Sequence, residues 1–356
     1  MGAPSLSIGV IAPPWVPVPP PVYGGTEVVV DHLARGLERA GHHVVLFTTG
    51  DSTCPVDRRS VLRDARGTCG LFTDELAHVQ AAYDELDGCD LIHDHTQLGP
   101  LWSMLKGGSP PVVTTVHGSF TPELTRLYRT VSPHAAVIAI SEHQRRSAPS
   151  VPVSAVIHHG IDVERVPVGR GRGGYVLFLG RMSPTKGVHR AMAVARRAGK
   201  KLLIAAKMWQ PEEVEYFRER VEPHLGADAV YIGEVGGRAK FDLLAKAEAL
   251  LNPIRWPEPF GLVMIEALAT GTPVVAFPEG AAPEIVDHGL TGFLCRDEDE
   301  MVERLRQIDT IDRRECRRTA EQRFSADRMV ADHVALYRRI VNGASRLQRF
   351  DLGRAG

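Results

Sequence analysis

The sequence of 356 residues has little of several features that would assign it to a specialised class of protein. Its five cysteines include no Cys-x-x-Cys pair, which argues against a disulfide framework or a structural zinc site and fits a reducing compartment. No run of eighteen apolar residues is present, so we expect no transmembrane segment. The first residues lack a basic stretch followed by an apolar run, so we also expect no signal peptide. A cytoplasmic location follows as the expectation.

Excess charge is also missing, because the formal net charge is only -1. No global field would therefore draw the chain to nucleic acid, and we expect no nucleic-acid partner. Peripheral contact with a membrane stays open. Lysine is scarce, with 7 residues against 35 arginines, which we interpret as a coding bias and not as a binding signal. The length exceeds one ordinary hydrophobic core and suits two domains.

Short apolar, β-branched runs alternate with helical patterns along the chain, which predicts parallel sheets covered by helices on both faces. The expected strands of a first series are residues 7–12, 43–49, 90–95, 111–117, 136–141 and 154–160. Those of a second series are 175–180, 201–206, 229–235, 248–254, 272–277 and 291–295. Helices are expected at 26–41, 261–270 and 320–343, among others.

The polar, Gly-rich stretch 163–174 between the two series is interpreted as an interdomain linker. We therefore expect an α/β fold of two Rossmann-like, doubly wound domains. The first is expected at residues 1–165 and the second at 166–335, with a helix and tail at 336–356 crossing back to the first. Ligands of such sheets bind beyond the carboxyl ends of the strands, so a cleft between the domains is the expected site.

Two glutamates stand out in the apolar stretch EPFGLVMIEALATGTPVV, residues 258–275. Glu258 is expected in the loop before a short helix, and Glu266 about one turn inside it. The first amides of that helix, near Phe260, Gly261 and Leu262, would form an anion site. The carboxylates could then accept hydrogen bonds from sugar and ribose hydroxyls. The structural alternative, a buried helix with one glutamate favoured by its dipole, is equally compatible with this stretch alone.

Two further motifs favour a phosphate ligand. FLGRMSPTKG, residues 178–187, ends a strand with Arg181 and places Lys186 at a helix start, which suits a diphosphate. YGGTE, residues 23–27, follows a strand and opens a helix, so Gly24 and Gly25 let the backbone approach a phosphate. The alternatives are solvated surface charges for the first motif and an ordinary tight turn for the second.

Together these motifs resemble a retaining nucleotide-sugar glycosyltransferase of family 4 with the two-domain GT-B fold. The resemblance also rests on TTVHG (114–118), AISEHQR (139–145), HHGID (158–162) and the long run 249–294, and it covers nearly the whole chain in the expected order. It implies transfer of a sugar from a nucleoside diphosphate to the hydroxyl of an acceptor. The acceptor is expected to be a soluble small molecule or a glycan, in a setting such as antibiotic biosynthesis.

The resemblance also implies roles for individual residues. Arg181, Lys186 and the strand end at Gly180 would hold the pyrophosphate, Glu258 the donor sugar and Glu266 the ribose. The amides of Phe260, Gly261 and Leu262 would contact sugar or phosphate, Gly24 and Gly25 would reach the phosphate from the first domain, and His117 would lie near the donor sugar. The loops expected to read the acceptor carry Trp15, Tyr23, Thr96, Gln97, Trp102 and Phe120.

Some stretches depart from the family pattern or imitate other sites. IAAKMWQ, residues 204–210, stands where the family usually has a Gly-rich turn, and His159 stands where Asn is more usual. GRGRGG, residues 169–174, fits G-x-G-x-x-G but precedes a strand, so it fails the context of a dinucleotide site. The acids 297–299 are interpreted as a helix start. A metal site at His93 to His95 is disfavoured because strand alternation puts Asp94 on the face opposite the two histidines and no other ligand is in view. No metal and no cofactor are therefore expected, apart from the nucleotide-sugar donor as substrate.

Two other classes of protein remain as alternatives at this stage. One is a reversible sugar enzyme on the same scaffold, such as a sucrose-synthase-like or phosphorylase-like transferase or an epimerase. The other is a non-catalytic module that binds sugar nucleotides. The joint presence of Arg181, Lys186, Glu258 and Glu266 argues against the second.

Overall fold

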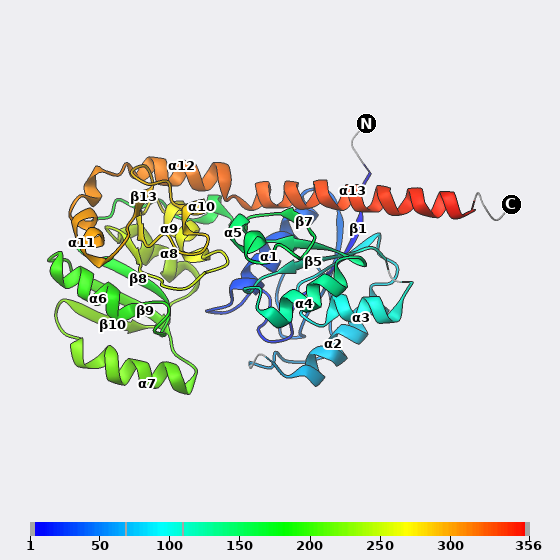
Figure 1. Cartoon of the computed structure of the whole chain (residues 1–356), viewed down its shortest axis with the longest axis horizontal. Helices are drawn as coiled ribbons and strands as arrows, with labels where there is room; N and C mark the ends of the chain where they lie inside the picture. The colour runs from blue at the N-terminus through cyan, green and yellow to red at the C-terminus, as the bar shows by residue number, and fades with distance from the viewer. Residues whose placement is uncertain (1–3, 68–69, 109, 353–356) are drawn as a thin grey trace. The chain divides into compact units, whose positions relative to one another are not determined.

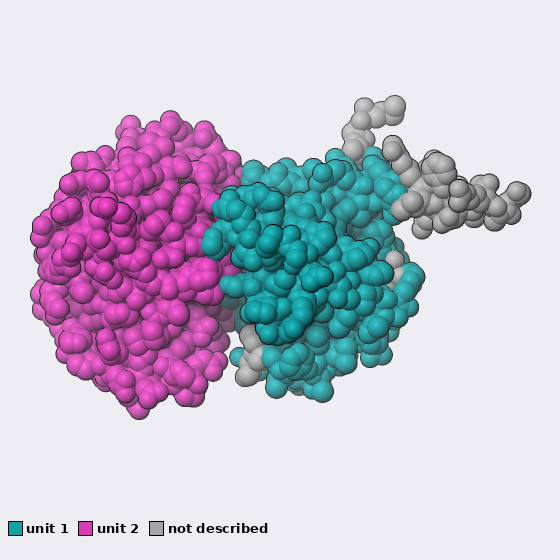
Figure 2. Space-filling view, viewed as in Figure 1, with its two compact units in different colours: residues 1–20, 24–159, 326–356 teal, residues 21–23, 160–325 magenta. Residues whose placement is uncertain are grey.

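The computed structural model describes residues 4–67, 70–108 and 110–352. The chain forms two compact units, shown in Figure 2: unit 1 comprises residues 1–20, 24–159 and 326–356, and unit 2 comprises residues 21–23 and 160–325. The chain thus passes to unit 2 at residue 160, where the sequence analysis placed the boundary at 165/166. It returns at residue 326, where a crossing helix was expected from 336; residues 353–356 of that tail lie outside the described part.

Unit 1 is built around a seven-stranded parallel sheet with the strand order β3-β2-β1-β4-β5-β6-β7. Figure 1 shows this sheet with helices packed around it. Its strands are β1 Ser7–Ile11, β2 His43–Phe47, β3 Asp57–Arg59, β4 Leu91–Asp94, β5 Val112–Val116, β6 Ala135–Ala139 and β7 Val153–Val156. Its α-helices are α1 Gly25–Arg39, α2 Phe72–Glu85, α3 Gly99–Lys106, α4 Pro122–Val131, α5 Glu142–Ser147 and α13 Ala326–Leu352.

Unit 2 repeats the design with a six-stranded parallel sheet of order β10-β9-β8-β11-β12-β13. Its strands are β8 Val176–Arg181, β9 Leu202–Lys207, β10 Ala229–Gly233, β11 Leu250–Asn252, β12 Val274–Ala276 and β13 Gly292–Leu294. Its α-helices are α6 Val188–Arg197, α7 Pro211–Arg220, α8 Gly237–Lys246, α9 Leu262–Ala269, α10 Ala282–Ile285, α11 Glu298–Arg306 and α12 Arg313–Arg323.

Both sheets are doubly wound, so each has a point where the strand order reverses. In unit 1 the chain leaves β1 toward β2 and later adds β4 on the other side of β1, and in unit 2 it does the same around β8 with β9 and β11. Central strands such as β5 are buried along their whole length, as expected for strands covered on both faces. The expected α/β class with two Rossmann-like domains is therefore confirmed. Ligands of such sheets bind at the carboxyl ends of the strands beside the reversal.

The structure differs from the sequence analysis at three places. The short strand β3 has the polar sequence DRR and carries no apolar signal, because it lies at the edge of the sheet. The helix expected at 320–343 is interrupted, because Phe324 leaves helical geometry and its carbonyl accepts a hydrogen bond from Ile161 N at 2.9 Å. The stretch expected as a linker is bound to unit 2, where Gly171 N and Gly173 N donate to carbonyls at the end of α8.

Other local expectations are confirmed. The acids at 297–299 do start a helix, since the side chain of Asp297 caps α11 by accepting a hydrogen bond from Glu300 N. The two histidines of HDH share one face of β4, with ring centroids 4.1 Å apart, while Asp94 points the other way and accepts a hydrogen bond from Tyr83.

None of the helices in the described part of the chain has the length and apolar character needed to cross a membrane.

The packing of α13 on α1 gives a stability test. A Cβ on Gly36 would lie 2.4 Å from Val330 Cγ2, so Gly36→Ala should lower the free energy of unfolding by about 1–3 kcal/mol through overpacking. Gly343 of the same helix α13 has open space around it, so Gly343→Ala should raise that free energy by about 0.5–1 kcal/mol. Urea unfolding measures both, and equal effects of the two substitutions would contradict the packing described.

Candidate active site

The carboxyl ends of β8 and β9 place two cations next to each other. Arg181 ends β8 and is in register with Lys207, which ends β9. The guanidinium of Arg181 contacts Glu213 Oε1 through Nη2 at 2.5 Å and Nε at 2.7 Å. Glu213 lies in the first turn of α7, where its other oxygen accepts hydrogen bonds from Trp209 N and Gln210 N. Arg181 is thus held at the strand end while its side chain stays 44% exposed.

The pKa of Glu213 reflects this arrangement. Burial of its carboxyl group acts to raise the pKa, but the amide donors of Trp209 and Gln210 together with Arg181 outweigh burial and lower the pKa below its usual value. Glu213 therefore stays a carboxylate and keeps Arg181 in place. The sequence analysis did not identify Glu213; its only signal is an acid in the first turn of a helix that begins with proline.

Lys186 and Glu258 form an ion pair beside this strand end. Lys186 lies in the loop that leads from β8 to α6, and its ammonium group donates to Glu258 Oε2. The same carboxylate oxygen accepts a hydrogen bond from Trp256 Nε1 at 2.6 Å. Both side chains are less than one-fifth exposed, 18% for Lys186 and 17% for Glu258. A charged pair this far from solvent needs mutual neutralisation, which explains why the two residues occur together.

Glu266 has a cation of its own. It lies in the second turn of α9, its side chain is 5% exposed, and its Oε1 accepts from Lys240 Nζ at 2.5 Å. Lys240 lies in the first turn of α8, after the glycines of VGGRAK. The sequence analysis missed Lys240, although a lysine that follows two glycines at a helix start repeats the phosphate-type pattern used for the other motifs.

The start of α9 has the backbone geometry expected of a close approach to a ligand. Gly261 precedes the helix with φ 98°, and a Cβ there would lie 2.6 Å from Met264 Cε, so only glycine fits without strain. The first backbone N–H groups of a helix have no hydrogen-bond partner within the helix. In α9 these are the N–H groups near Leu262, next to this turn. Phe260 is buried and packs edge-on against Phe324, with ring centroids 6.3 Å apart.

Tyr23 belongs with these residues and not with the unit-1 residues predicted to read the acceptor, because the segment 21–23 is part of unit 2. Burial, helped by the nearby carboxylates of Glu258 and Glu266 and opposed by Arg181, raises its pKa to about 12. Its ring lies 4.7 Å from the ammonium group of Lys207, which also lies 3.4 Å from the ring centroid of Trp209. The IAAKMWQ stretch thus supplies an aromatic and a cation at the same sheet edge.

In unit 1, the predicted phosphate loop lies at the strand reversal. Gly24 is the N-cap of α1 and Gly25 its first residue, and both follow the loop after β1. A Cβ on Gly24 would lie 2.8 Å from both Glu27 Oε2 and Pro20 Cβ, so the turn has no room for a side chain. The buried Glu27 in the first turn suits the positive end of the helix dipole.

His117 directly follows β5 and belongs to a group of five histidines in unit 1. Its Nε2 lies 2.8 Å from His95 Nδ1, and its ring stacks on His159 with centroids 5.3 Å apart. His93 continues the group between His95 and His333, at centroid distances of 4.1 Å and 5.2 Å. Burial is the main cause that lowers the pKa of every member, to about 3 for His117 and about 4 for His333. All five are therefore neutral at pH 7.

The remaining residues predicted to read the acceptor are spread over unit 1. The hydroxyl of Thr96 is buried, donates a hydrogen bond to Asp94 Oδ1 and accepts one from Gly99 N. It is therefore already engaged both as a donor and as an acceptor. Gln97 is exposed at the following position, Phe120 packs edge-on against Tyr128, and Trp15 is buried. Among the described residues, no three His, Cys, Asp or Glu side chains converge in a way that could hold a metal ion.

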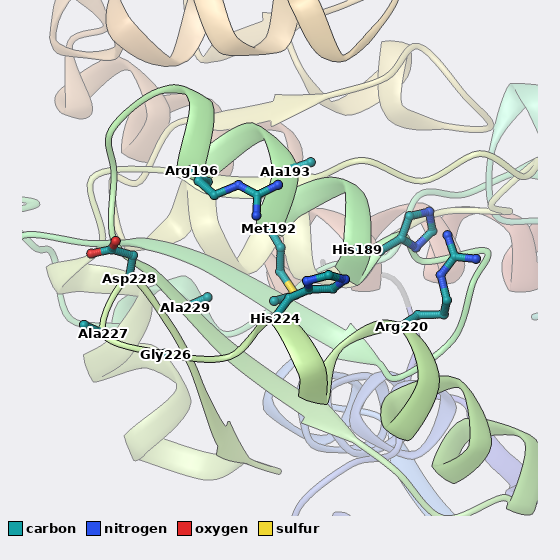
Figure 3. A pocket seen from close by; sticks show the side chains of 10 residues that line it. All are labelled: His189, Met192, Ala193, Arg196, Arg220, His224, Gly226, Ala227, Asp228 and Ala229. Carbon is teal, nitrogen blue, oxygen red and sulfur yellow. The ribbon is translucent and has the colours of Figure 1, made fainter.

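A separate pocket of about 350 Å³ lies in unit 2, between α6, the end of α7 and the start of β10. Figure 3 shows Arg196 and Arg220 reaching toward it from opposite ends, with His224 between them. Its lining residues are His189, Met192, Ala193, Arg196, Arg220, His224, Gly226, Ala227, Asp228 and Ala229. None of the predicted site residues lines this pocket.

Comparison with known proteins gives consistent results for both units. The family model "Glycosyltransferase Family 4" matches residues 23–165, and "Glycosyl transferases group 1" matches residues 173–309. The chain is 28% identical over 370 residues to glycogen synthase of Mycobacterium tuberculosis, which covers 87% of this chain and 88% of that protein. It is 27% identical over 323 residues to phosphatidyl-myo-inositol mannosyltransferase of the same species, at 81% and 82% coverage.

Solved structures agree with the fold. AviGT4, a glycosyltransferase involved in Avilamycin A biosynthesis, superposes with a TM-score of 0.72 at 28% identity, covering 95% of this chain and 98% of that one. Sucrose-phosphate synthase of Thermosynechococcus elongatus gives a TM-score of 0.79 at 20% identity, covering 95% and 100%, and so supports the fold alone. Two Rossmann-like units with these relatives define the GT-B fold. The chain is a glycosyltransferase with that fold.

The histidine group predicts how stability depends on pH. Each buried histidine has a folded-state pKa below the unfolded value of about 6.5, so the unfolded chain binds more protons below pH 6.5 and stability is lost as the pH falls. Each such histidine should remove about 1 kcal/mol of stability between pH 6.5 and 5.5, because the unfolded imidazole goes from half to about nine-tenths protonated over that range. Urea unfolding at the two pH values measures this loss of stability. In His333→Phe the loss should be smaller by the contribution of one histidine. An unfolding free energy that does not change with pH would contradict the buried, neutral group.

Proposed function

We propose that the chain is a retaining family 4 glycosyltransferase that moves a sugar from a nucleoside-diphosphate sugar to an acceptor hydroxyl without a metal. One observation carries the proposal: three cations and two carboxylates meet at the strand reversal of unit 2. Arg181 and Lys186 follow β8, Glu258 follows β11, and Glu266 pairs with Lys240. A diphosphate needs the cations, and the hydroxyls of a sugar and a ribose need the carboxylates.

Binding of the donor would exchange partners within this set. Lys186 would turn from Glu258 to the diphosphate, which frees the Glu258 carboxylate to accept hydrogen bonds from the donor sugar. Trp256 Nε1 keeps Glu258 in position during this exchange, because its hydrogen bond does not involve the lysine. Arg181 keeps its carboxylate partner Glu213 and still has exposed N–H groups to offer. Lys207, in register with Arg181, adds a further positive charge at the same edge.

The reaction breaks the bond between the anomeric carbon and the diphosphate oxygen and forms a bond from that carbon to the acceptor oxygen. We propose that the acceptor attacks from the face the diphosphate leaves, and that the departing phosphate takes the acceptor's proton. The work of the protein is then to stabilise negative charge that builds on the leaving phosphate, through donors fixed in advance. Glu213 fixes Arg181 before the donor arrives, and Glu258 holds Lys186 close by until the diphosphate binds.

The acceptor is proposed as a small molecule or a glycan. AviGT4, at 28% identity, is involved in Avilamycin A biosynthesis, which supports a small-molecule acceptor and a role in antibiotic biosynthesis. A cytoplasmic location is proposed with it, since the donor would be a soluble nucleotide sugar.

Nucleotide binding tests the ribose role of Glu266. One of UDP, GDP, ADP and dTDP should bind in calorimetry, and EDTA should not weaken that binding. Glu266→Ala should weaken it by about 10- to 100-fold, because a hydrogen bond to a charged group contributes roughly 1.5–3 kcal/mol. Glu248→Ala is the matched control, since Glu248 also pairs with a lysine, Lys200, at 2.6 Å but has no proposed role. Equal losses in both variants, or a requirement for metal, would overturn the donor site.

Turnover tests the diphosphate role of the cations. Arg181→Ala and Lys186→Ala should each lower kcat for donor consumption by about 100- to 1,000-fold, as expected when one donor to a developing charge is removed. Lys200→Ala, which breaks a cation–carboxylate pair outside the proposed site, should leave kcat unchanged. The anomeric configuration of the product, read by NMR, should match that of the donor. Full activity in Lys186→Ala or an inverted product would refute the proposed mechanism.

A further inference from the structure

The group of five histidines contains one direct hydrogen bond between two imidazole rings. His95 directly follows β4 and His117 directly follows β5, and because these strands are neighbours the two side chains meet. His95 Nδ1 and His117 Nε2 are 2.8 Å apart. With both rings neutral, one proton lies between these two nitrogens, so one ring donates and the other accepts.

His95 is held firmly in place for this contact. It is 5% exposed, its backbone N–H donates to Ile11 O at 2.9 Å, and its ring lies against that of His93. His93 is itself fixed at both nitrogens, by Tyr337 OH at 2.6 Å and Thr115 Oγ1 at 2.8 Å. His95 can therefore not turn away from His117 without disturbing the central strands of unit 1.

The second nitrogen of His95 decides which ring donates. Within the described residues, His95 Nε2 is buried and has no hydrogen-bond partner. An orphaned buried N–H is rarer and more costly in proteins than an orphaned acceptor, so the proton of His95 belongs on Nδ1 and not on Nε2. His95 Nδ1–H then donates to His117 Nε2. Because His117 is neutral, its own proton must lie on Nδ1.

Charges around the pair do not disturb this assignment. The titratable groups that act on the two rings are the other three histidines, His93, His159 and His333, and burial is the largest influence on both. Behind them, Arg328 lies near His159 and His333, and Asp332 opposes it at His333. Burial outweighs the opposing charge of Asp332 and keeps the rings neutral, so a single shared proton is the state at pH 7.

We propose that His95 is a positioning residue for the transfer reaction: its hydrogen bond fixes the ring of His117 and presents His117 Nδ1–H as a donor. This proposal rests on the proposed function and on the expectation from the family resemblance that His117 lies near the donor sugar. His117 is partly exposed, unlike His95, so its Nδ1 can reach a ligand. An N–H at this point would donate to an oxygen of the sugar. His95 itself touches no substrate.

The test combines a direct readout of the proton with kinetics. In ¹⁵N NMR of the full chain, wild-type His117 should carry its proton on Nδ1. His95→Phe keeps a ring against His93 but cannot donate, so His117 should change to a different or mixed tautomer. The same variant should lower kcat for donor consumption by about 10- to 100-fold with little change in KM, because misplaced catalytic groups have costs of this order. His95→Gln, whose amide can donate, should restore part of both properties.

A matched control separates positioning from general loss of a buried imidazole. His78 is a fully buried histidine of the same unit that is hydrogen-bonded to Ala12 O at 2.9 Å, and His78→Phe should leave the His117 tautomer and kcat unchanged. A wild-type His117 protonated on Nε2, or an unchanged tautomer in His95→Phe, would overturn the proposal. So would a changed tautomer with an unchanged kcat. If wild type consumes no nucleotide sugar at all, the proposed function fails, while the NMR still reports whether the hydrogen bond orders the ring.

Discussion

The proposed site depends on the pairing of buried or half-buried carboxylates with cations near the carboxyl ends of the strands of unit 2. Glu258 and Glu266 could not remain charged among the apolar residues of this region unless cations neutralised them. Lys186 and Lys240 do so, each from a different element of unit 2. The pairs fix the side chains in the positions that a diphosphate and its sugar would need. A ligand that carries phosphates and hydroxyl groups can take over both halves of these pairs. Its phosphates can bind the lysines, and its hydroxyl groups can donate to the carboxylates.

The topology explains why these residues come together. In unit 2 the strand order reverses at β8, so the loops after β8 and β11 open on the same edge and carry Arg181, Lys186 and Glu258. In unit 1 the loops after β1, β4 and β5 carry the Gly24–Gly25 turn, His95 and His117. In each unit the proposed site residues named here thus lie beside the carboxyl ends of strands, where doubly wound sheets generally bind ligands.

Much of this could be predicted from the sequence, because the signals are local. The β-branched runs gave the central strands, and the glutamates, glycines and cations that stand next to strand or helix ends gave the proposed donor residues. The pairing of Glu213 with Arg181 and of Lys240 with Glu266 could not be predicted, since these partners lie more than twenty residues apart and are brought near only by the fold. The same holds for the histidine group, in which His333 of α13 reaches His93 of β4. The edge strand β3 lacks an apolar run because one of its sides has no neighbour.

A structure of the protein with a bound, non-hydrolysable nucleotide sugar tests the central claim most directly. The account predicts that the diphosphate lies against Arg181 and Lys186, that the ammonium group of Lys186 has left Glu258 for a phosphate oxygen, and that Glu266 accepts the ribose hydroxyls. A diphosphate bound elsewhere, or one bound while the Lys186–Glu258 and Lys240–Glu266 pairs stay intact, would contradict it.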